Sequence, residues 1–176
     1  MSLHNGKIIK IPLSEKSAPI VWSLGHRNPQ GIDVDPVTNN LYSLEFGPRG
    51  GDELNLIKKG KNYGWPLITY GKEYWGPAIG PTHKKGLEQP VEHWTPSISP
   101  SAMEFYTGNK IKAWKNNLFL ACLSGMHLRK LVLKGNKVIS QEKLFADLQE
   151  RIRNVRTGLD GYLYFSTDSG KLYKVQ

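Results

Sequence analysis

The sequence predicts an all-β protein assembled from several small antiparallel sheets, and three observations lead to this prediction. The 176 residues include 18 Gly and 11 Pro, a composition that favours many turns and short strands over long helices. Short apolar runs of β-prone residues end repeatedly at glycine. One strand–turn–strand phrase also returns along the chain, whereas the only helical candidate, Gln141–Glu150, is short and weak.

The repeated phrase has the same parts at each occurrence. Its centre is a short apolar strand that ends in glycine, at Leu41–Gly47, Leu118–Gly125 and Leu163–Gly170. An earlier strand and a turn precede each centre, and these strands are expected at Gly31–Val34, Ala102–Tyr106 and Ile152–Val155. A further strand follows each centre, at Glu53–Ile57, Leu128–Leu133 and Lys171–Val175. Repeats of roughly 40–50 residues built from such strands are typical of β-propeller blades.

The beginning of the chain extends the pattern, because Gly6–Ile11 closely resembles the ending Gly170–Val175. We therefore expect the chain to run from the third strand of one blade to the third strand of a blade about three repeats later. In this single partial β-propeller, 1–11 ends a preceding blade, 62–97 is a long ordered loop rich in aromatic residues, and the blade-like repeats lie at 20–61, 98–135 and 150–176. A sandwich of short strands is the alternative, which explains the turns but not the recurring phrase.

About three blades cannot close into a ring, and a propeller protects its sheet edges by closing one. Open ends would expose unpaired strand edges and an apolar blade face. We therefore expect either that the chain is part of a longer protein or that it pairs with a second copy as a homodimer.

Composition limits the class of partner. Lys and Arg number 24 against 15 Asp and Glu, so the net charge of +9 favours an anionic partner. Nucleic acid is not expected, because the basic residues are scattered and no recognition motif is present. The single Cys122 lies in an apolar run and is expected to be a buried strand residue. No run of 18 apolar residues predicts a membrane span, and the beginning of the chain shows no signal peptide.

Three polar clusters interrupt the strands, and the first is GHRNPQG at Gly25–Gly31. Arg27 offers a planar fork of donors suited to a carboxylate or phosphate, while Asn28 and Gln30 offer amides that read a carbonyl or a ring edge. A polar connecting loop whose side chains satisfy backbone groups is the alternative.

The second cluster is FGPRGGDE at Phe46–Glu53. Constrained backbone carbonyls at Gly47 and Pro48, with carboxylates at Asp52 and Glu53, make a plausible site for a hard cation, and calcium is the natural candidate. The alternative is a Gly-rich hairpin whose acids are solvated or paired with Arg49.

The third cluster is the pair Arg151 and Arg153, which point to one face of an expected strand. Two guanidiniums on one face repel each other unless an anion sits between them. An exposed edge strand that keeps its charges for solubility is the alternative. The histidines at 4, 26, 83, 93 and 127 show no metal-ligand spacing. No P-loop, G-x-S-x-G, C-x-x-C or dinucleotide fingerprint is present.

Taken together, GHRNPQG, FGPRGGDELNLIKKGKNYGWP and RIRNVRTGLDGYLYFSTD resemble the soluble quinoprotein sugar dehydrogenases of the glucose/sorbosone dehydrogenase family, with the aldose dehydrogenases of bacteria as the nearest match. The resemblance runs from about Gly6 to Val175. It implies a six-bladed propeller, of which this chain would be the C-terminal half, and the cofactors pyrroloquinoline quinone (PQQ) and calcium. It also implies oxidation of an aldose at C1 to the lactone, with electrons passed to a respiratory or artificial acceptor.

The resemblance also implies roles for single residues. Residues that contact the quinone would be Arg27, Asn28, Gln30, Thr95, Ser97, Arg151 and Arg153. Calcium would be bound by Gly47, Pro48, Glu53 and Tyr63. The parent protein would be periplasmic or extracellular.

Two departures from the family pattern bear on activity. The catalytic histidine of the family lies upstream of the matched region, so no catalytic residue is expected in this chain, which alone would show weak or no turnover. Ser124 stands where many relatives place a lysine against the quinone. A non-catalytic propeller that serves as a binding module is therefore the alternative function.

Overall fold

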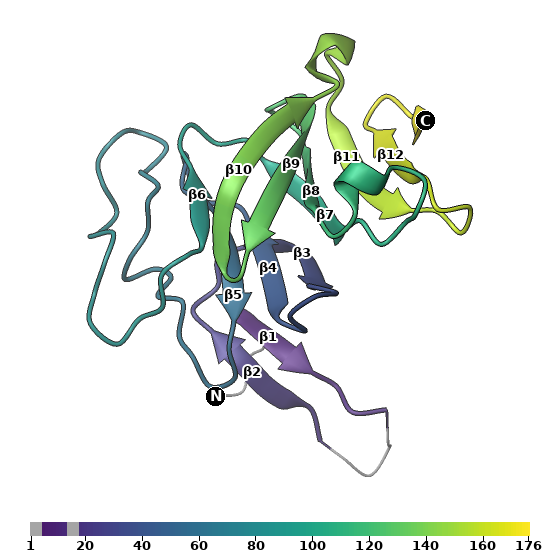
Figure 1. Ribbon diagram of the computed structural model, residues 1–176. Coiled ribbons are helices and arrows are strands. Elements are labelled where there is room, and N and C mark those ends of the chain that lie inside the picture. Colours follow the sequence, from purple (N-terminus) through teal and green to yellow (C-terminus); the bar gives the residue numbers. More distant parts are fainter. Residues whose placement is uncertain (1–4, 14–17) are drawn as a thin grey trace.

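The computed structural model describes residues 5–13 and 18–176, so His4 lies outside the described residues. Apart from two single-turn 3₁₀ segments, η1 (Lys112–Trp114) and η2 (Ala146–Leu148), this part of the chain consists of strands and loops (Figure 1). The strands are β1 (Lys7–Lys10), β2 (Ile20–Leu24), β3 (Pro29–Val34), β4 (Leu41–Glu45), β5 (Asp52–Ile57), β6 (Glu92–Trp94), β7 (Pro100–Phe105), β8 (Leu118–Cys122), β9 (His127–Lys134), β10 (Lys137–Leu144), β11 (Ile152–Thr157), β12 (Leu163–Thr167) and β13 (Leu172–Val175).

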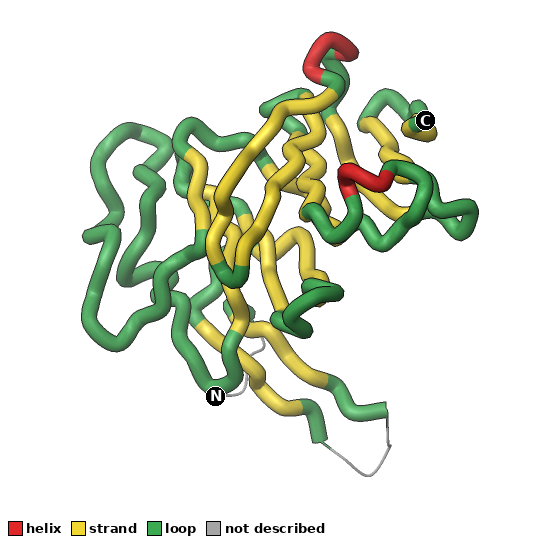
Figure 2. Tube along the Cα trace, viewed as in Figure 1, coloured by secondary structure: helices red, strands yellow, loops and turns green. Residues whose placement is uncertain are grey.

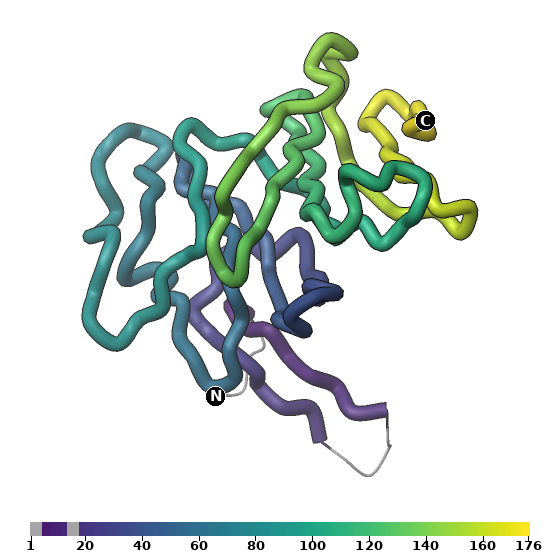
Figure 3. The backbone as a smooth tube through the Cα atoms, in the orientation of Figure 1, coloured from purple at the N-terminus to yellow at the C-terminus, as the bar shows by residue number. Residues whose placement is uncertain are grey.

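The strands form four antiparallel sheets in chain order. β3–β6 and β7–β10 are four-stranded, β11–β13 is three-stranded, and β1 pairs only with β2. The β1–β2 hairpin lies at one end of the arrangement and β11–β13 at the other (Figure 3). The protein is therefore all-β and has the architecture of a partial β-propeller, as the repeats predict.

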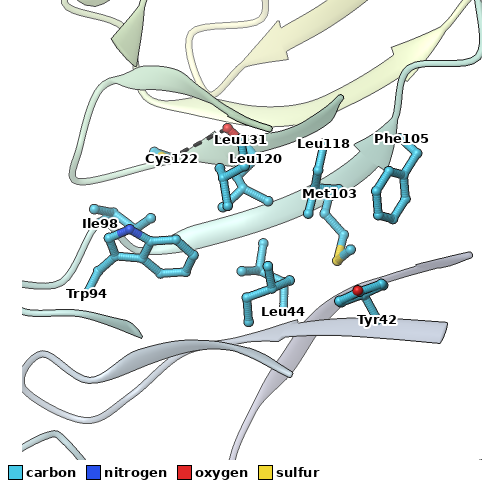
Figure 4. Packing of buried hydrophobic residues seen from close by; sticks show 11 residues of the cluster. Tyr42, Leu44, Trp94, Ile98, Met103, Phe105, Leu118, Leu120, Cys122 and Leu131 are labelled. Atoms are coloured by element: carbon cyan, nitrogen blue, oxygen red, sulfur yellow. Dashed lines mark hydrogen bonds between the residues drawn. The ribbon is translucent and has the colours of Figure 1, made fainter. Parts of the chain in front are cut away.

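Neighbouring sheets pack face to face because their strands bury both faces. In β8, Leu118, Leu120 and Cys122 join the core shared with β3–β6, and Phe119 and Ala121 join the core shared with β11–β13. This alternation follows from the two-residue period of a strand. Figure 4 shows the first core, in which Tyr42 and Leu44 face Met103 and Leu120. The predicted buried position of Cys122 is confirmed.

The inner strands of the three larger sheets run side by side in the same direction. Asp33 Oδ2 of β3 accepts a hydrogen bond from the Phe105 amide of β7 at 2.7 Å. Ser101 Oγ of β7 donates to the Ile152 carbonyl of β11 at 2.9 Å, and Glu104, three residues later, contacts Arg156. The first residues of β3, β7 and β11 consequently share one end of the molecule.

The outermost strands depart from the predicted repeats in every sheet but β11–β13, whose β13 matches the predicted strand Lys171–Val175. Ile20–Leu24, assigned to the repeat 20–61, instead completes the sheet of β1. Glu92–Trp94 forms a strand inside the predicted loop 62–97, which is otherwise mostly irregular (Figure 2). The helical prediction for Gln141–Glu150 is wrong: residues up to Leu144 belong to β10, and a 3₁₀ turn follows. β10 lies on the outside of its sheet with most side chains exposed, so its charged sequence lacks the apolar alternation of a strand.

Candidate functional site

Three loops lead into the shared end of the inner strands. Residues 25–28 precede β3, residues 95–99 precede β7, and Arg151 precedes β11. The loop 46–51, between β4 and β5, lies against the first two: Arg27 Nη1 donates to the Gly47 carbonyl, and the Gly51 amide donates to Thr95 Oγ1. The three clusters that the sequence singles out thus occur at one end of the molecule.

Glu45, the last residue of β4, fixes the first loop. Its carboxylate is 4% exposed and accepts hydrogen bonds from the backbone amides of Arg27 at 2.7 Å and Asn28 at 3.4 Å. The other oxygen contacts His26 Nδ1 at 3.1 Å and accepts from Asn55 Nδ2 at 2.9 Å. Sequence reasoning missed Glu45, which ends β4 directly before the second cluster.

His26 is a structural residue of this loop. It is 1% exposed, lies 2.8 Å from Ser23 Oγ through Nε2, and stacks on Tyr63 with 4.7 Å between ring centroids. Both ring nitrogens therefore have partners, and the imidazole holds Glu45 in place.

Arg27 joins the loop 25–28 to the loop 46–51. Its Nη1 donates to the carbonyl oxygens of Gly47 at 3.0 Å and Phe46 at 3.3 Å, and its guanidinium lies 5.4 Å from the ring centroid of Trp65. The Gly47 carbonyl therefore faces the same space as the guanidinium. A carbonyl oxygen has two lone pairs, so it retains one for a further donor or a cation.

Asp52 joins the loop 46–51 to the loop 95–99. Its side chain is fully buried; Oδ1 accepts from the Gly47 amide at 3.0 Å, and Oδ2 accepts from Ser97 Oγ at 2.8 Å. Oδ2 also accepts from the amides of Ile98 at 2.7 Å and Ser99 at 3.1 Å. Burial raises the pKa of Asp52, and these hydrogen bonds offset the rise only in part. The carboxylate is thus neither solvated nor paired with Arg49.

Gly47 could not be another residue in this arrangement. A Cβ at this position would lie 2.1 Å from the Gly50 carbonyl oxygen and 2.4 Å from that of Gly51. The loop folds back on itself at this contact, and only glycine permits so close an approach.

Two carboxylates lie side by side below this loop. Glu45 and Glu53 are cross-strand neighbours of β4 and β5, and Asn55 Nδ2 donates to both, at 2.9 and 3.1 Å. Burial, and then the negative charge of Glu45, raise the pKa of Glu53 to about 7. Both line a hollow of about 10 Å³ together with Tyr63, which is room for one water-sized sphere.

Backbone groups already occupy the hydroxyl of Tyr63, a predicted calcium ligand. It donates to the Leu56 carbonyl and accepts from the Lys58 amide at 2.9 Å, while burial raises the pKa of Tyr63 to about 12. Within the described residues no group of three or more His, Cys, Asp or Glu side chains could hold a metal ion. A cation here would depend on backbone carbonyls and water as well as carboxylates.

A wider hollow of about 460 Å³ opens above the joined loops. Among the predicted cofactor residues, Arg27, Asn28 and Ser97 line it, together with Gly47 and Pro48. The other four do not line it. Gln30 lines a separate hollow beside Met103, although its Nε2 donates to Asn28 Oδ1 at 2.8 Å. Thr95 Oγ1 accepts a hydrogen bond from the Gly51 amide at 3.0 Å, and Arg151 and Arg153 bind Asp168.

Ser124 is hydrogen-bonded to the loop 95–99. Its hydroxyl donates to the Ser97 carbonyl at 3.2 Å and shares a hydrogen bond of 2.7 Å with the Ser99 hydroxyl. Where a lysine would add a positive charge, this chain has a neutral hydrogen-bonded network.

Arg151 and Arg153 do have an anion between them, and it is Asp168. The Nε atoms donate to separate oxygens of its carboxylate, at 2.9 Å from Arg151 and 2.7 Å from Arg153. Hydrogen bonds from Arg153 and then Arg151 lower the pKa of Asp168. Each guanidinium is hydrogen-bonded to Asp168 through Nε, so its terminal nitrogens keep donors for a further partner. Sequence reasoning did not identify this acid.

A family model described as Glucose / Sorbosone dehydrogenase matches residues 4–174. The chain belongs to this family. The aldose sugar dehydrogenase YliI of Escherichia coli strain K12 is 46% identical over 160 residues, covering 88% of this chain and 43% of that protein.

Solved structures of glucose/sorbosone dehydrogenase relatives agree with the fold. A crystal structure of a glucose dehydrogenase has a TM-score of 0.86 and 47% identity, over 93% of this chain and 49% of that one. The PQQ-bound aldose sugar dehydrogenase of Streptomyces coelicolor has a TM-score of 0.68 and 31% identity, over 92% and 46%. This chain spans less than half the length of its curated relatives, at 46% and 43% of the first two.

Proposed function

We propose that the chain is the C-terminal half of a soluble PQQ- and calcium-dependent sugar dehydrogenase that oxidises an aldose at C1 to the lactone. The observation that carries this proposal is the meeting of Arg27, the Gly47 carbonyl and Ser97 around one hollow, held together by buried Asp52. Membership in the family supports the reaction class.

The donors present fit a quinone that carries three carboxylates. Arg27 and Asn28 line the hollow, and at the same end of the molecule Arg151 and Arg153 use Nε for Asp168 and retain the donors of their terminal nitrogens. Arginine forks bind carboxylates through paired hydrogen bonds. Ser97 and Ser99 add polar groups to the wall.

The acceptors present fit a calcium ion. The carboxylates of Glu45 and Glu53 repel each other beside a space for one small sphere, and Asn55 Oδ1 is buried there without a hydrogen-bond partner. The Gly47 and Pro48 backbone lies at the border of the wider hollow. Oxygen ligands of this kind are the ones that calcium prefers.

When bound, PQQ supplies a hydride-accepting carbon and calcium acts on it as a Lewis acid. The residues of this chain bind and orient: Arg27 and the Arg151–Arg153 pair hold carboxylates, while Asp52 keeps Gly47 and Ser97 in register. The base that takes up the hydroxyl proton is assigned to no residue of this chain. We further propose a periplasmic or extracellular parent protein and an artificial or respiratory electron acceptor.

Fluorescence titration tests the proposal, because five Trp are available as reporters. The chain is titrated with PQQ at saturating calcium, and we expect quenching that requires the metal. Arg153→Ala should weaken PQQ binding by about tenfold, the loss of one charge-assisted pair. Arg156→Ala is the matched control, since Arg156 pairs with Glu104 farther along the same strand. Equal affinities for the two variants would contradict the assigned cofactor site.

Adding an aldose and a dye acceptor to the loaded chain tests the second part of the proposal. Little dye reduction is expected, and rapid turnover would show that a base lies within this chain.

A non-catalytic binding module is the second candidate, and the neutral Ser124 network favours it. Absence of PQQ binding even at high calcium would support this candidate. In either case, a second copy could pair with the sheets β1–β2 and β11–β13, which have two and three strands. Light scattering after size exclusion tests this homodimer, and a monomer at all concentrations would rule it out.

A further inference from the structure

The long loop between β5 and β6 carries a small hairpin that the proposed cofactor site does not use. Lys72 pairs with Arg49 through two backbone hydrogen bonds of 3.2 Å, and it also bridges to Ala78. The Glu73 amide donates to the Pro77 carbonyl at 2.9 Å, which closes the turn. Arg49 Nη1 donates to the Tyr74 carbonyl at 3.3 Å. The hairpin is therefore tied to the loop that contains Gly47 and Pro48.

The tip of this hairpin presents two aromatic side chains to solvent. Tyr74 is 67% exposed and Trp75 is 77% exposed, whereas the other four Trp are buried or half-buried. Exposed aromatic rings lose the burial that normally stabilises them, so a pair of them on a tethered turn indicates a contact surface.

This pair borders the proposed cofactor site. Tyr74 lines the hollow of about 460 Å³ together with Arg27, Asn28 and Ser97. The hairpin arises from the β3–β6 sheet, which has β1–β2 on one side and β7–β10 on the other.

The surroundings of the pair favour a sugar over an apolar partner. A pyranose ring has an apolar face of C–H groups that stacks on an aromatic ring, and a rim of hydroxyls that needs hydrogen-bond partners. Arg49 and Lys72 are exposed next to the aromatic tip and supply donors for that rim. An apolar peptide would leave these charges without partners.

We propose that Tyr74 and Trp75 form a stacking platform for a pyranose ring that lies beyond the one to be oxidised. The inference rests on the proposed function, since it takes the hollow beside Tyr74 as the place of the reacting ring. It assigns to this site a preference for di- and oligosaccharides.

Binding of maltotriose to the chain without cofactor tests the platform, by calorimetry and by saturation-transfer NMR. Tyr74→Ala and Trp75→Ala should each weaken binding by about fivefold, the usual contribution of one aromatic contact. Trp75→Phe keeps a ring and should stay within about twofold of the unaltered chain. Leu67→Ala is the matched control, because Leu67 is a 54% exposed apolar residue of the same loop. All three side chains are exposed, so the four variants should fold normally.

The platform is overturned if the unaltered chain does not bind maltotriose, if both alanine variants bind it equally well, or if Trp75→Phe binds as weakly as Trp75→Ala. Titration of the same proteins with PQQ and calcium separates the two proposals. Sugar binding that depends on Tyr74 and Trp75 without any PQQ binding would support the platform and reject the dehydrogenase site. PQQ binding, together with maltotriose binding that the Tyr74 and Trp75 variants leave unchanged, would support the dehydrogenase site and reject the platform.

Discussion

Asp52→Asn is the substitution that most directly tests how the loops of the site are held. All four partners of the Asp52 carboxylate are donors: the Gly47, Ile98 and Ser99 amides and the Ser97 hydroxyl. An asparagine can keep three of them with its single oxygen. Its NH₂ group must then face the buried Gly47 N–H, where two donors oppose each other.

The expected loss follows from this mismatch and not from the lost charge. Burial raises the pKa of Asp52, so the negative charge by itself does not stabilise the folded state. A buried donor left without an acceptor costs about 2 kcal/mol. With a urea m-value of about 2 kcal/mol/M, the unfolding midpoint should fall by about 1 M.

Urea unfolding of Asp52→Asn, followed by Trp fluorescence, measures this loss. Ser97→Ala is the graded control: it removes one of the four donors to the carboxylate but leaves the carboxylate with the other three, and should cost about 1 kcal/mol. Because the substitution displaces the Gly47 peptide, calorimetry should also show weaker calcium binding for Asp52→Asn. An Asp52→Asn protein as stable as the unaltered one would refute the idea that this carboxylate joins the two loops.

Three further predictions concern stability and reactivity. The pKa of Glu53 rises from 4.5 to about 7 on folding, so the folded chain holds a proton that the unfolded chain releases, and stability should fall as the pH rises through that window. Glu53→Gln should remove this component, which urea midpoints at pH 5 and pH 8 will detect. Burial raises the pKa of Cys122 to about 12, so a thiol reagent at pH 8 should modify Cys122 only as fast as the protein unfolds; rapid labelling of the native protein would contradict its burial. Leu120→Ala should cost about 3 kcal/mol by leaving a cavity. Leu172→Ala, at a 72% exposed position, should change stability by less than about 0.5 kcal/mol in the same urea assay.

The sequence revealed the inner strands of the two four-stranded sheets and all three strands of β11–β13, but not the outer strands β6 and β10. Strands such as Leu118–Cys122 are buried on both faces and read as apolar runs bounded by turns. The outermost strand packs on one sheet edge only, so its composition is close to that of a loop. Lys137–Leu144 is mostly exposed, and its Gln, Glu and Lys residues are equally compatible with a helix.

The candidate site shows a similar division. The motifs located Arg27, Gly47 and Arg151, because guanidiniums, glycines and prolines in a loop carry a recognisable chemistry. They could not locate Glu45, since a single acid at the end of a strand has no local signature. Asp168 was missed for the same reason: its relation to Arg151 arises only when β11 and β12 pair.

Irregular loops that carry a polar site need internal support, and here two buried carboxylates at strand ends provide it. Glu45 at the end of β4 accepts the amides of the loop before β3, and Asp52 at the start of β5 accepts those of the loop before β7. The backbone of each acid is held by strand pairing, Glu45 with β5 and Asp52 with β6, in a sheet that packs against its neighbour. The sheets therefore set the positions of Arg27 and Gly47 indirectly, since the loops follow the two carboxylates. A propeller can thus vary the ligands in its loops while these strand-end acids keep the loops in register.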